Sequence, residues 1–197
     1  GIAEHRPTKI KGICSRLERP VAETLGKFQN QLEDYPASTL HETIARFHDT
    51  PNRYANFEKA LAADALNRAK NTAPEIEFIH AREKDCHVLL DQLAAGEIPL
   101  RVTHNDTKIN NVLIDAATGK GICVIDLDTV MPSLFVSDYG DFLRTGANYV
   151  AEDCPDMGKV GFNMDIFKAF TEGYLKGAGS FLLPVEIENL PYAAALF

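Results

Sequence analysis

The chain has 197 residues, of which 45% are hydrophobic and 24% charged, and this composition is ordinary for a globular domain or lobe. The formal net charge of −8 argues against anionic partners, namely nucleic acids and acidic membrane surfaces. No apolar run approaches the ~20 residues of a membrane-spanning helix. The four cysteines are scattered without a CxxC pair, so we expect reduced, mostly buried thiols and a cytoplasmic protein.

The first half of the chain predicts helices and no strand. Residues 1–20 are basic and weakly patterned, and we expect them to be a residual segment or linker before a lobe over 21–197. Pro20 opens a predicted helix, because an apolar stripe at helical spacing follows it. The stripe consists of Val21, Leu25, Phe28 and Leu32, and further helices are predicted over 39–47, 54–69 and 74–96.

Four histidines accompany these helical patterns, and surface or capping positions are the favoured interpretation for them. They are His41, His48, His80 and His87. His48 is of most interest, because an aspartate follows it directly.

The pattern changes after Gly96. Short apolar runs predict strands at 99–102, 112–115 and 121–126, and the last two are joined by the turn-like run AATGK. Beyond Pro132 the chain is expected to return to helices, over about 137–151, 163–176 and 184–197.

The polar run THNDTKINN, residues 103–111, lies between two of these strands. An antiparallel hairpin folded at Thr118-Gly119 would place Val112 opposite Ile125 and Asn111 opposite Asp126. The polar run would then end beside Asp126 and Asp128, with Asp106 and Lys108 over the same end. Amide and carboxylate oxygens of this kind suit Mg²⁺, which also takes phosphate oxygens and water.

The order of these residues matches the template of kinase-type phosphoryl transfer from ATP. In this interpretation Asp106 accepts the proton of the attacking hydroxyl, and Lys108 meets the transferred phosphate. Asn111 and Asp126 hold the metal, while His104 supports the loop. Positioning and charge neutralisation then supply most of the catalysis.

At these residues the chain resembles the aminoglycoside phosphotransferase / choline kinase superfamily, whose members have a protein-kinase-like fold. The usual His-Gly-Asp with a distal Asn is here His104-Asn105-Asp106 with Asn111. HNDTKINNVLID, CVIDLDTVMP, DYGD and LRTGAN, with LGKFQNQL and ARFHDTPNRY upstream, are most similar to the N-acetylhexosamine 1-kinase branch. That branch phosphorylates the anomeric hydroxyl of N-acetylhexosamines with ATP and Mg²⁺.

The resemblance assigns roles by position. It implies Asp106 as the base and Asn111 and Asp126 as Mg²⁺ ligands, with Asp128 as a second metal or substrate contact. Asp138 and Asp141 are expected to fix the loop after the hairpin or to cap the next helix. For Arg144 an ion pair with these acids is favoured over a contact with phosphate or sugar.

The fold class expected is α+β and mainly α-helical: the C-terminal lobe of a protein-kinase-like fold with a small catalytic β-hairpin. Residues 1–103 show nothing like the strands and lysine of an N-terminal nucleotide lobe. We therefore expect a fragment, trimmed at both ends, whose main partner besides ATP and a sugar is the N-terminal lobe of the same protein. Alone it is expected to be inactive.

Two alternatives remain. ICVIDLDTV resembles the first motif of haloacid-dehalogenase phosphatases, with Asp126 as nucleophile and Asp128 as acid/base, although the further strand–helix units of that fold are hard to find. A non-catalytic kinase-like binding domain is the second alternative. A sulfatase is excluded, because the sequence after Cys154 lacks the C/S-x-P-x-R arrangement.

Overall fold

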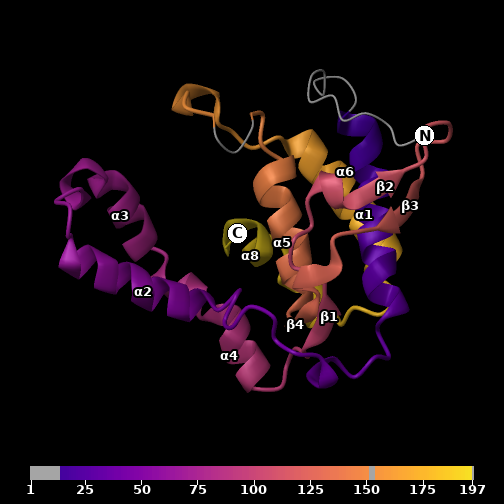
Figure 1. Ribbon diagram of the computed structural model, residues 1–197, viewed down its shortest axis with the longest axis horizontal. Helices are drawn as coiled ribbons and strands as arrows, with labels where there is room; N and C mark the ends of the chain where they lie inside the picture. Colours follow the sequence, from indigo (N-terminus) through magenta and orange to yellow (C-terminus); the bar gives the residue numbers. More distant parts are fainter. Residues whose placement is uncertain (1–13, 151–153, 197) are drawn as a thin grey trace.

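The computed structural model describes residues 14–150 and 154–196 (Figure 1). This part of the chain is mainly helical and carries two small antiparallel sheets of two strands each, which confirms the expected α+β, mainly α-helical class. The expected segment 1–20 lies largely outside the described residues. Within them, no helix combines the length and apolarity that crossing a membrane requires.

The secondary structure follows one order along the chain. The helices are α1 Cys14–Gln31, α2 Thr50–Ala63, α3 Ala73–His80, α4 Val88–Ala94, α5 Phe135–Gly146, α6 Met164–Ala178, α7 Pro184–Glu188 and α8 Leu190–Leu196. The strands are β1 Arg101–Thr103, β2 Val112–Ile114, β3 Gly121–Val124 and β4 Met131–Ser133. No strand precedes Arg101 in the described residues, as predicted.

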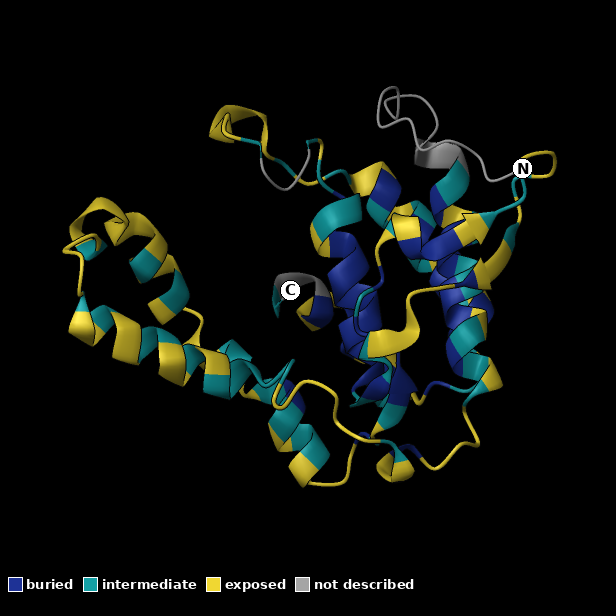
Figure 2. Ribbon diagram, viewed as in Figure 1, coloured by how far each residue is buried: buried dark blue, intermediate teal, exposed yellow. Residues whose placement is uncertain are grey.

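Helices α1, α5 and α6 hold most of the buried side chains (Figure 2). The predicted stripe on α1 faces this core: Val21 and Leu25 are buried, and Phe28 packs against the core half-buried. On α6, Phe170 and Tyr174 are fully buried. Helix α1 contacts β3 and α5 contacts β1, so the core supports the two strands from which the loops of the candidate site begin.

The start of α1 was predicted wrongly. The helix begins at Cys14 and contains Pro20, although proline lacks the N–H that bonds to the carbonyl four residues earlier. The hydroxyl of Thr24 donates to the Pro20 carbonyl oxygen at 2.7 Å, and Glu18 is already buried. The buried face of α1 therefore begins before Pro20, and the helix continues through the proline.

The predicted helix over 39–47 is also wrong. Only a 3-10 turn, Ala37–Thr39, forms there, and the Thr39 hydroxyl donates to Pro36 instead of capping a helix. Arg46 has a φ of 56°, which no α-helix accommodates. The Glu42 carboxylate accepts the Arg46 N–H at 2.9 Å, so a side chain closes this loop.

Helices α2 and α3 form an arm that projects from the body and has no buried residue (Figures 1 and 2). Helix α2 begins four residues before the predicted start, because Asp49 caps it by accepting the Asn52 N–H, and it ends where Asp64 turns left-handed. The predicted helix over 74–96 is divided into α3 and α4 by a 3-10 turn, Glu83–Cys86. Gly96 ends α4 with a φ of 74°, as its position predicted.

The hairpin β2–β3 forms, but its register differs from the predicted one. Val112 pairs with Val124 instead of Ile125, and the register shifts between Leu113 and Ile114. A one-residue shift of this kind changes which side chains share a face of the hairpin. The predicted turn is present, and the Asp115 carboxylate accepts the Thr118 N–H and hydroxyl, which lowers the pKa of Asp115.

A second pair of strands, β1 with β4, was only half predicted, since β4 has no alternating pattern. Arg101 in β1 forms a two-pronged ion pair with the fully buried Glu186 of α7, at 2.7 and 2.6 Å. A bidentate ion pair is strong and geometrically specific, so it fixes β1 relative to α7. The polar loop therefore begins at a strand whose position is fixed.

Helices form in the three C-terminal regions where they were predicted, but their first and last residues differ from the prediction. Helix α5 begins at Phe135 and ends at Gly146, and α6 is capped by Asn163, which accepts the Asp165 and Ile166 N–H groups. The predicted helix over 184–197 is two helices, α7 and α8. The expectation of buried thiols is wrong for three cysteines, because Cys86 and Cys154 are half-buried and Cys123 is exposed on strand β3.

Two glycines of α6 allow the backbones of α1 and α6 to approach closely. A Cβ on Gly173 would lie 2.4 Å from the Arg19 carbonyl oxygen, and one on Gly177 would lie 2.5 Å from the Glu23 carbonyl oxygen. Both obstacles are backbone atoms, so rotation of a side chain cannot relieve them.

Gly173→Ala should therefore lower the free energy of unfolding by about 2 kcal/mol, because overpacking outweighs a gain of roughly 1 kcal/mol in helix propensity. Urea unfolding measures this. Gly158→Ala is the matched control and should stay near wild type, since its nearest neighbour, at 3.3 Å, is a side-chain oxygen of Asp156. Wild-type stability of Gly173→Ala would contradict the close helix contact.

Candidate active site

The polar loop, residues 104–111, joins β1 to β2 and is anchored by helix α5. We call it the candidate catalytic loop. The Asp138 carboxylate accepts the N–H of His104 at 2.9 Å and that of Asn105 at 2.7 Å. Gln29 of α1 donates to the same carboxylate at 2.7 Å. Burial raises the pKa of Asp138, while these three donors act in the opposite direction.

Asp141 anchors the next part of the loop. Its Oδ2 accepts the Thr107 N–H at 2.8 Å, and its Oδ1 pairs with Arg144 at 3.0 Å. The ion pair favoured for Arg144 is thus present. Asp138 and Asp141 both contact the loop that precedes the hairpin, whereas the sequence suggested the loop that follows it.

His104 connects the candidate catalytic loop to the end of β3. Its ring is fully buried, and Phe28 lies edge-on to it at 5.9 Å between ring centroids. Nδ1 accepts the Asp106 N–H at 3.2 Å, so Nε2 carries the proton and donates to the Ile125 carbonyl oxygen at 2.9 Å. The imidazole thereby holds Asp106 and the residue before Asp126 at a fixed separation.

Asn105 has a φ of 66°, a left-handed backbone conformation that glycine and asparagine adopt more readily than other residues. Its amide donates to the carbonyl oxygens of Thr103 and Thr129 at 3.2 and 3.1 Å. Thr129 in turn donates its hydroxyl to the His104 carbonyl oxygen at 2.7 Å. The asparagine therefore crosslinks β1 to the segment after β3, which glycine could not do.

Asp106, Lys108 and Asn111 meet directly. The Lys108 ammonium lies 2.8 Å from Asp106 Oδ1, and the Asn111 amide nitrogen donates to Asp106 Oδ2 at 3.1 Å and to its carbonyl oxygen at 2.8 Å. Asp106 is half-buried and Asn111 is buried. Since the Asn111 nitrogen is directed at Asp106, its oxygen is the atom left to act as a ligand.

Asp126 and Asp128 follow β3 and are exposed. The Ile125 N–H donates to the Asn111 carbonyl oxygen at 2.9 Å, so Asp126 is brought to the loop through the main chain of its neighbour. Asp126 itself is left-handed, with φ 65° and ψ 58°, a conformation that is uncommon for residues other than glycine. Asp128 lies one turn further, in the 3-10 turn Leu127–Thr129.

A divalent cation would find oxygen donors here. Among the described residues, no group of three or more His, Cys, Asp or Glu side chains forms a metal site by itself. The donors available are the Asn111 oxygen and the carboxylates of Asp126 and Asp128. Such a small set fits Mg²⁺, which typically takes one or two carboxylates and completes its shell with phosphate oxygens and water.

Two residues of this support were missed by the sequence interpretation. Gln29 accepts the Tyr174 hydroxyl and donates to Asp138, and so connects α6 and α1 to the loop anchor. Thr107 donates its hydroxyl to the Asp138 carbonyl oxygen at 2.6 Å. Thr107 does not stand out within the polar run. Gln29 could have been noticed only as a polar residue beside the apolar stripe of α1.

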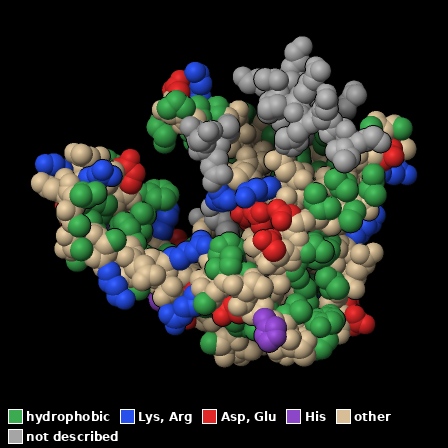
Figure 3. All heavy atoms as spheres, viewed as in Figure 1, with side chains coloured by type: hydrophobic (Ala, Val, Ile, Leu, Met, Phe, Trp, Pro, Cys, Tyr) green, Lys and Arg blue, Asp and Glu red, His purple; other side chains and the backbone are tan. Residues whose placement is uncertain are grey.

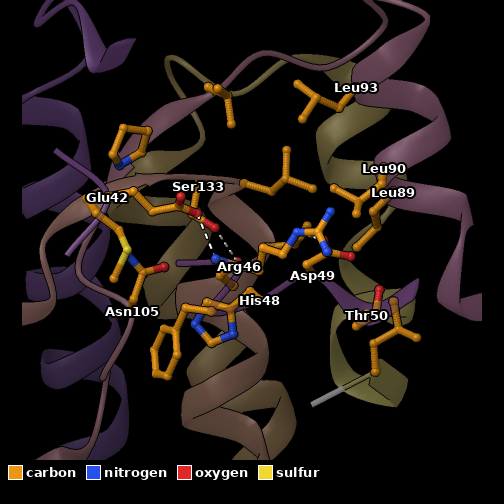
Figure 4. A pocket seen from close by; sticks show the side chains of 18 residues that line it. Glu42, Arg46, His48, Asp49, Thr50, Leu89, Leu90, Leu93, Asn105 and Ser133 are labelled. Atoms are coloured by element: carbon orange, nitrogen blue, oxygen red, sulfur yellow. Dashed lines mark hydrogen bonds and ion pairs between the residues drawn. The ribbon is translucent and has the colours of Figure 1, made fainter. Parts of the chain in front are cut away.

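A cavity of about 210 Å³ adjoins the loop at Asn105. Its lining comes from segment 42–50, α4, β4 and the start of α5. Figure 4 shows the leucines of α4 on one side and Glu42, Ser133 and Asn105 on the other. Figure 3 shows acidic side chains gathered near the middle of the visible face, with basic side chains beside them.

His48 lies in this cavity, and its pKa is lowered from 6.5 to about 4. Burial is the main cause, and the charge of Arg53 adds to it. The ring centroid lies 4.4 Å from that of Phe47. At neutral pH the imidazole is therefore uncharged.

This pKa predicts a pH-dependent stability. Because the unfolded histidine titrates near 6.5 and the folded one near 4, the unfolded state takes up the proton first as the pH falls. His48 should therefore cost about 2–3 kcal/mol of stability between pH 6.5 and 4. Urea unfolding of wild type and His48→Gln across this range measures it; a difference that does not vary with pH would contradict the shift.

The chain matches a known protein family. The family model described as the phosphotransferase enzyme family (APH) matches residues 15–174. The matched region includes the candidate catalytic loop, the hairpin and the anchoring helix α5. The chain belongs to the phosphotransferase enzyme family.

Proposed function

We propose that the protein is an ATP- and Mg²⁺-dependent kinase that phosphorylates the anomeric hydroxyl of an N-acetylhexosamine. Membership of the phosphotransferase enzyme family gives the reaction class. The sugar and its anomeric position come from the resemblance of the loop and hairpin sequences to N-acetylhexosamine 1-kinases.

One observation carries the proposal: the Asp106 carboxylate lies between Lys108 and the Asn111 amide on a loop whose main chain is held by buried carboxylates. A base positioned in this way needs little rearrangement before reaction. The order and contacts of these residues fit a reaction in which Asp106 takes the proton of an attacking hydroxyl and the charge of Lys108 neutralises the transferred phosphate.

In the proposed reaction, Asp106 accepts the proton of the sugar hydroxyl as that oxygen bonds to the γ-phosphorus of ATP. The bond between this phosphorus and the β–γ bridging oxygen breaks, and ADP leaves. Lys108 exchanges its ion pair with Asp106 for the transferred phosphate and neutralises part of its charge. Asn111 and Asp126 would hold Mg²⁺, with Asp128 nearby, and the ion would supply charge neutralisation of the β- and γ-phosphates. His104 keeps Asp106 and the Asp126 segment in register through its two ring nitrogens.

We further propose that the described residues form the C-terminal lobe of the kinase over 21–197, and that an N-terminal lobe completes the nucleotide site. The absence of any strand before Arg101 among the described residues supports this division. Alone, this lobe should bind ATP weakly and turn over negligibly. Activity is therefore to be measured on the enzyme that carries both lobes.

An acceptor panel tests the proposal. The enzyme with both lobes, ATP and Mg²⁺ is expected to phosphorylate N-acetylglucosamine or N-acetylgalactosamine, and ¹H–³¹P NMR should locate the phosphate on the anomeric oxygen. Transfer to other positions, or to aminoglycosides alone, would refute the sugar 1-kinase assignment while leaving the family intact.

The phosphatase alternative is not favoured. The strands of the described residues pair in two antiparallel sheets of two. After Asp126 the described part of the chain has one short strand, β4, and then helices α5–α8, whereas a haloacid-dehalogenase fold needs several further strand–helix units. Release of phosphate from a generic phosphomonoester without ATP, lost on Asp126→Asn, would reverse this conclusion. A non-catalytic binding domain is also disfavoured, since Asp106, Asn111 and Asp126 are all present.

A further inference from the structure

A chain of buried polar groups runs from α6 to the candidate catalytic loop. Tyr174 of α6 donates its hydroxyl proton to the side-chain oxygen of Gln29, and the Gln29 amide nitrogen donates to Asp138 Oδ2 at 2.7 Å. The same Oδ2 accepts the His104 N–H, while Oδ1 accepts that of Asn105. Each of these five residues is at most 2% exposed, so water cannot replace a partner that is lost.

The direction of each hydrogen bond in this chain is fixed by chemistry. Asp138 receives three N–H donors, and a protonated carboxyl would direct its own hydrogen at one of them, so Asp138 accepts as a carboxylate. The Gln29 amide must therefore turn its nitrogen to Asp138 and its oxygen to Tyr174. Burial, together with the charge of Asp138, raises the pKa of Tyr174 well above its ordinary value, so its hydroxyl keeps the proton that it donates.

Close packing of α1 on α6 brings the tyrosine to the glutamine. A Cβ on Gly26 of α1 would lie 2.7 Å from the Tyr174 carbonyl oxygen, so this glycine allows the two helices to approach at that point. Gln29 follows about one helical turn later. Its neighbour Phe28 lies edge-on to the His104 ring at 5.9 Å between centroids. Helix α1 thus contacts the candidate catalytic loop and the carboxylate that anchors it from adjacent positions.

Loss of the Gln29 donor would act on the proposed base. Oδ2 of Asp138 would keep only the main-chain donor of His104, and a buried carboxylate that is incompletely hydrogen-bonded rotates or takes up a proton. Either change moves the N–H groups of His104 and Asn105 that Asp138 holds. Asp106 follows Asn105 directly, so its carboxylate moves with them. A misplacement of 1 Å can cost about 10²-fold in rate.

We infer that Gln29 and Tyr174 are positioning residues of the proposed reaction. Tyr174 orients the Gln29 amide, and Gln29 in turn holds the carboxylate of Asp138. That carboxylate keeps the loop main chain, and with it Asp106, in the reactive position. The inference rests on the proposed function, since it takes Asp106 as the base. It places determinants of the rate on α1 and α6, outside the motifs of the loop and the hairpin.

Steady-state kinetics of the enzyme with both lobes tests the inference, with the N-acetylhexosamine that the wild type phosphorylates as acceptor. Gln29→Leu removes the donor and should lower kcat by about 10–10²-fold, with the KM values for ATP and acceptor little changed. Tyr174→Phe removes only the hydroxyl and should lower kcat less, because the amide can still donate. The double variant should lose no more than Gln29→Leu alone, because Tyr174 acts through Gln29.

Two variants are matched controls for the packing of the core helices. Asn30→Leu removes an amide of α1 that donates to the Gly177 carbonyl oxygen of α6 at 3.3 Å. Tyr139→Phe removes a buried tyrosine hydroxyl that bonds to the Thr171 hydroxyl at 2.7 Å. Neither hydrogen bond involves Asp138 or the candidate catalytic loop. Both variants should keep the kcat of wild type, even where thermal unfolding shows that they have lost stability.

Amide hydrogen exchange gives a second readout that does not depend on turnover. The His104 and Asn105 amides should exchange faster in Gln29→Leu than in wild type, whereas Asn30→Leu should leave their exchange unchanged. Faster exchange at these two amides, together with a lower kcat, is the result that supports a positioning role.

The outcomes separate the inference from the proposed function. Wild-type kcat in Gln29→Leu, or a rise in KM alone, would overturn the inference and leave the proposed function standing. Additive losses in the double variant would also overturn it. If the wild type phosphorylates no N-acetylhexosamine, the proposed function fails and the claim about the rate fails with it. Should Gln29→Leu not fold, Tyr174→Phe and Tyr139→Phe decide, and equal kcat in these two would overturn the inference.

Discussion

Replacing Asp106 with asparagine is expected to lower kcat for N-acetylhexosamine phosphorylation by about 10²–10⁴-fold, because the base that accepts the hydroxyl proton is lost. The amide keeps the size of the carboxylate and can still contact Asn111. The ion pair that Asp106 forms with the exposed Lys108 in the wild type contributes little to stability, so the fold of the variant should be unaffected. Coupled-enzyme detection of ADP measures the rate.

Asp34→Asn is the matched control for this experiment, since Asp34 is an exposed carboxylate outside the candidate site. It should leave both kcat and KM unchanged. Wild-type activity in Asp106→Asn would remove Asp106 from its proposed role. A loss of activity together with a loss of thermal stability would point to a structural role instead.

The second large effect is expected for Asp138→Ala. The carboxylate is buried and accepts N–H groups from His104, Asn105 and Gln29, and each buried donor left without a partner costs about 1–3 kcal/mol. We expect the free energy of unfolding to fall by at least about 3 kcal/mol. A displacement of the loop by 1 Å can also cost about 10²-fold in rate, so kcat should fall.

Urea unfolding and amide hydrogen exchange test this expectation. The His104 and Asn105 amides should exchange much faster in Asp138→Ala than in wild type. Asp138→Asn retains one acceptor oxygen and should lie between the two in stability, while Asp34→Ala should match wild type. Unchanged protection of the two amides in Asp138→Ala would show that the loop is held by other contacts.

The elements predicted correctly are those that are determined by residues close together in the sequence. The stripe on α1, the hairpin turn at Thr118-Gly119 and the glycine at the end of α4 depend on neighbouring residues alone. The predictions that were wrong depend on distant contacts. The loop 40–49 has a helical apolar pattern, but the left-handed Arg46 and its contact with Glu42 override that pattern.

The candidate site was predictable to a similar degree. Spacing alone indicated that Asp106, Lys108 and Asn111 belong together, and they are in contact. The register of the hairpin was off by one residue, because a bulge is invisible in an alternating pattern. Asp138 was expected to fix a loop, although a different one, whereas its hydrogen bond from Gln29 could not be predicted, since the two residues are more than a hundred positions apart.

Crystallisation of the enzyme with both lobes, Mg²⁺ and a non-hydrolysable ATP analogue tests the central claim most directly. We predict that the Asn111 side-chain oxygen and the Asp126 carboxylate bind the same cation, which also contacts the β- and γ-phosphates. The Asp106 carboxylate should face the side from which the acceptor hydroxyl attacks. A cation bound without Asn111 and Asp126, or a nucleotide bound away from residues 104–111, would contradict the account.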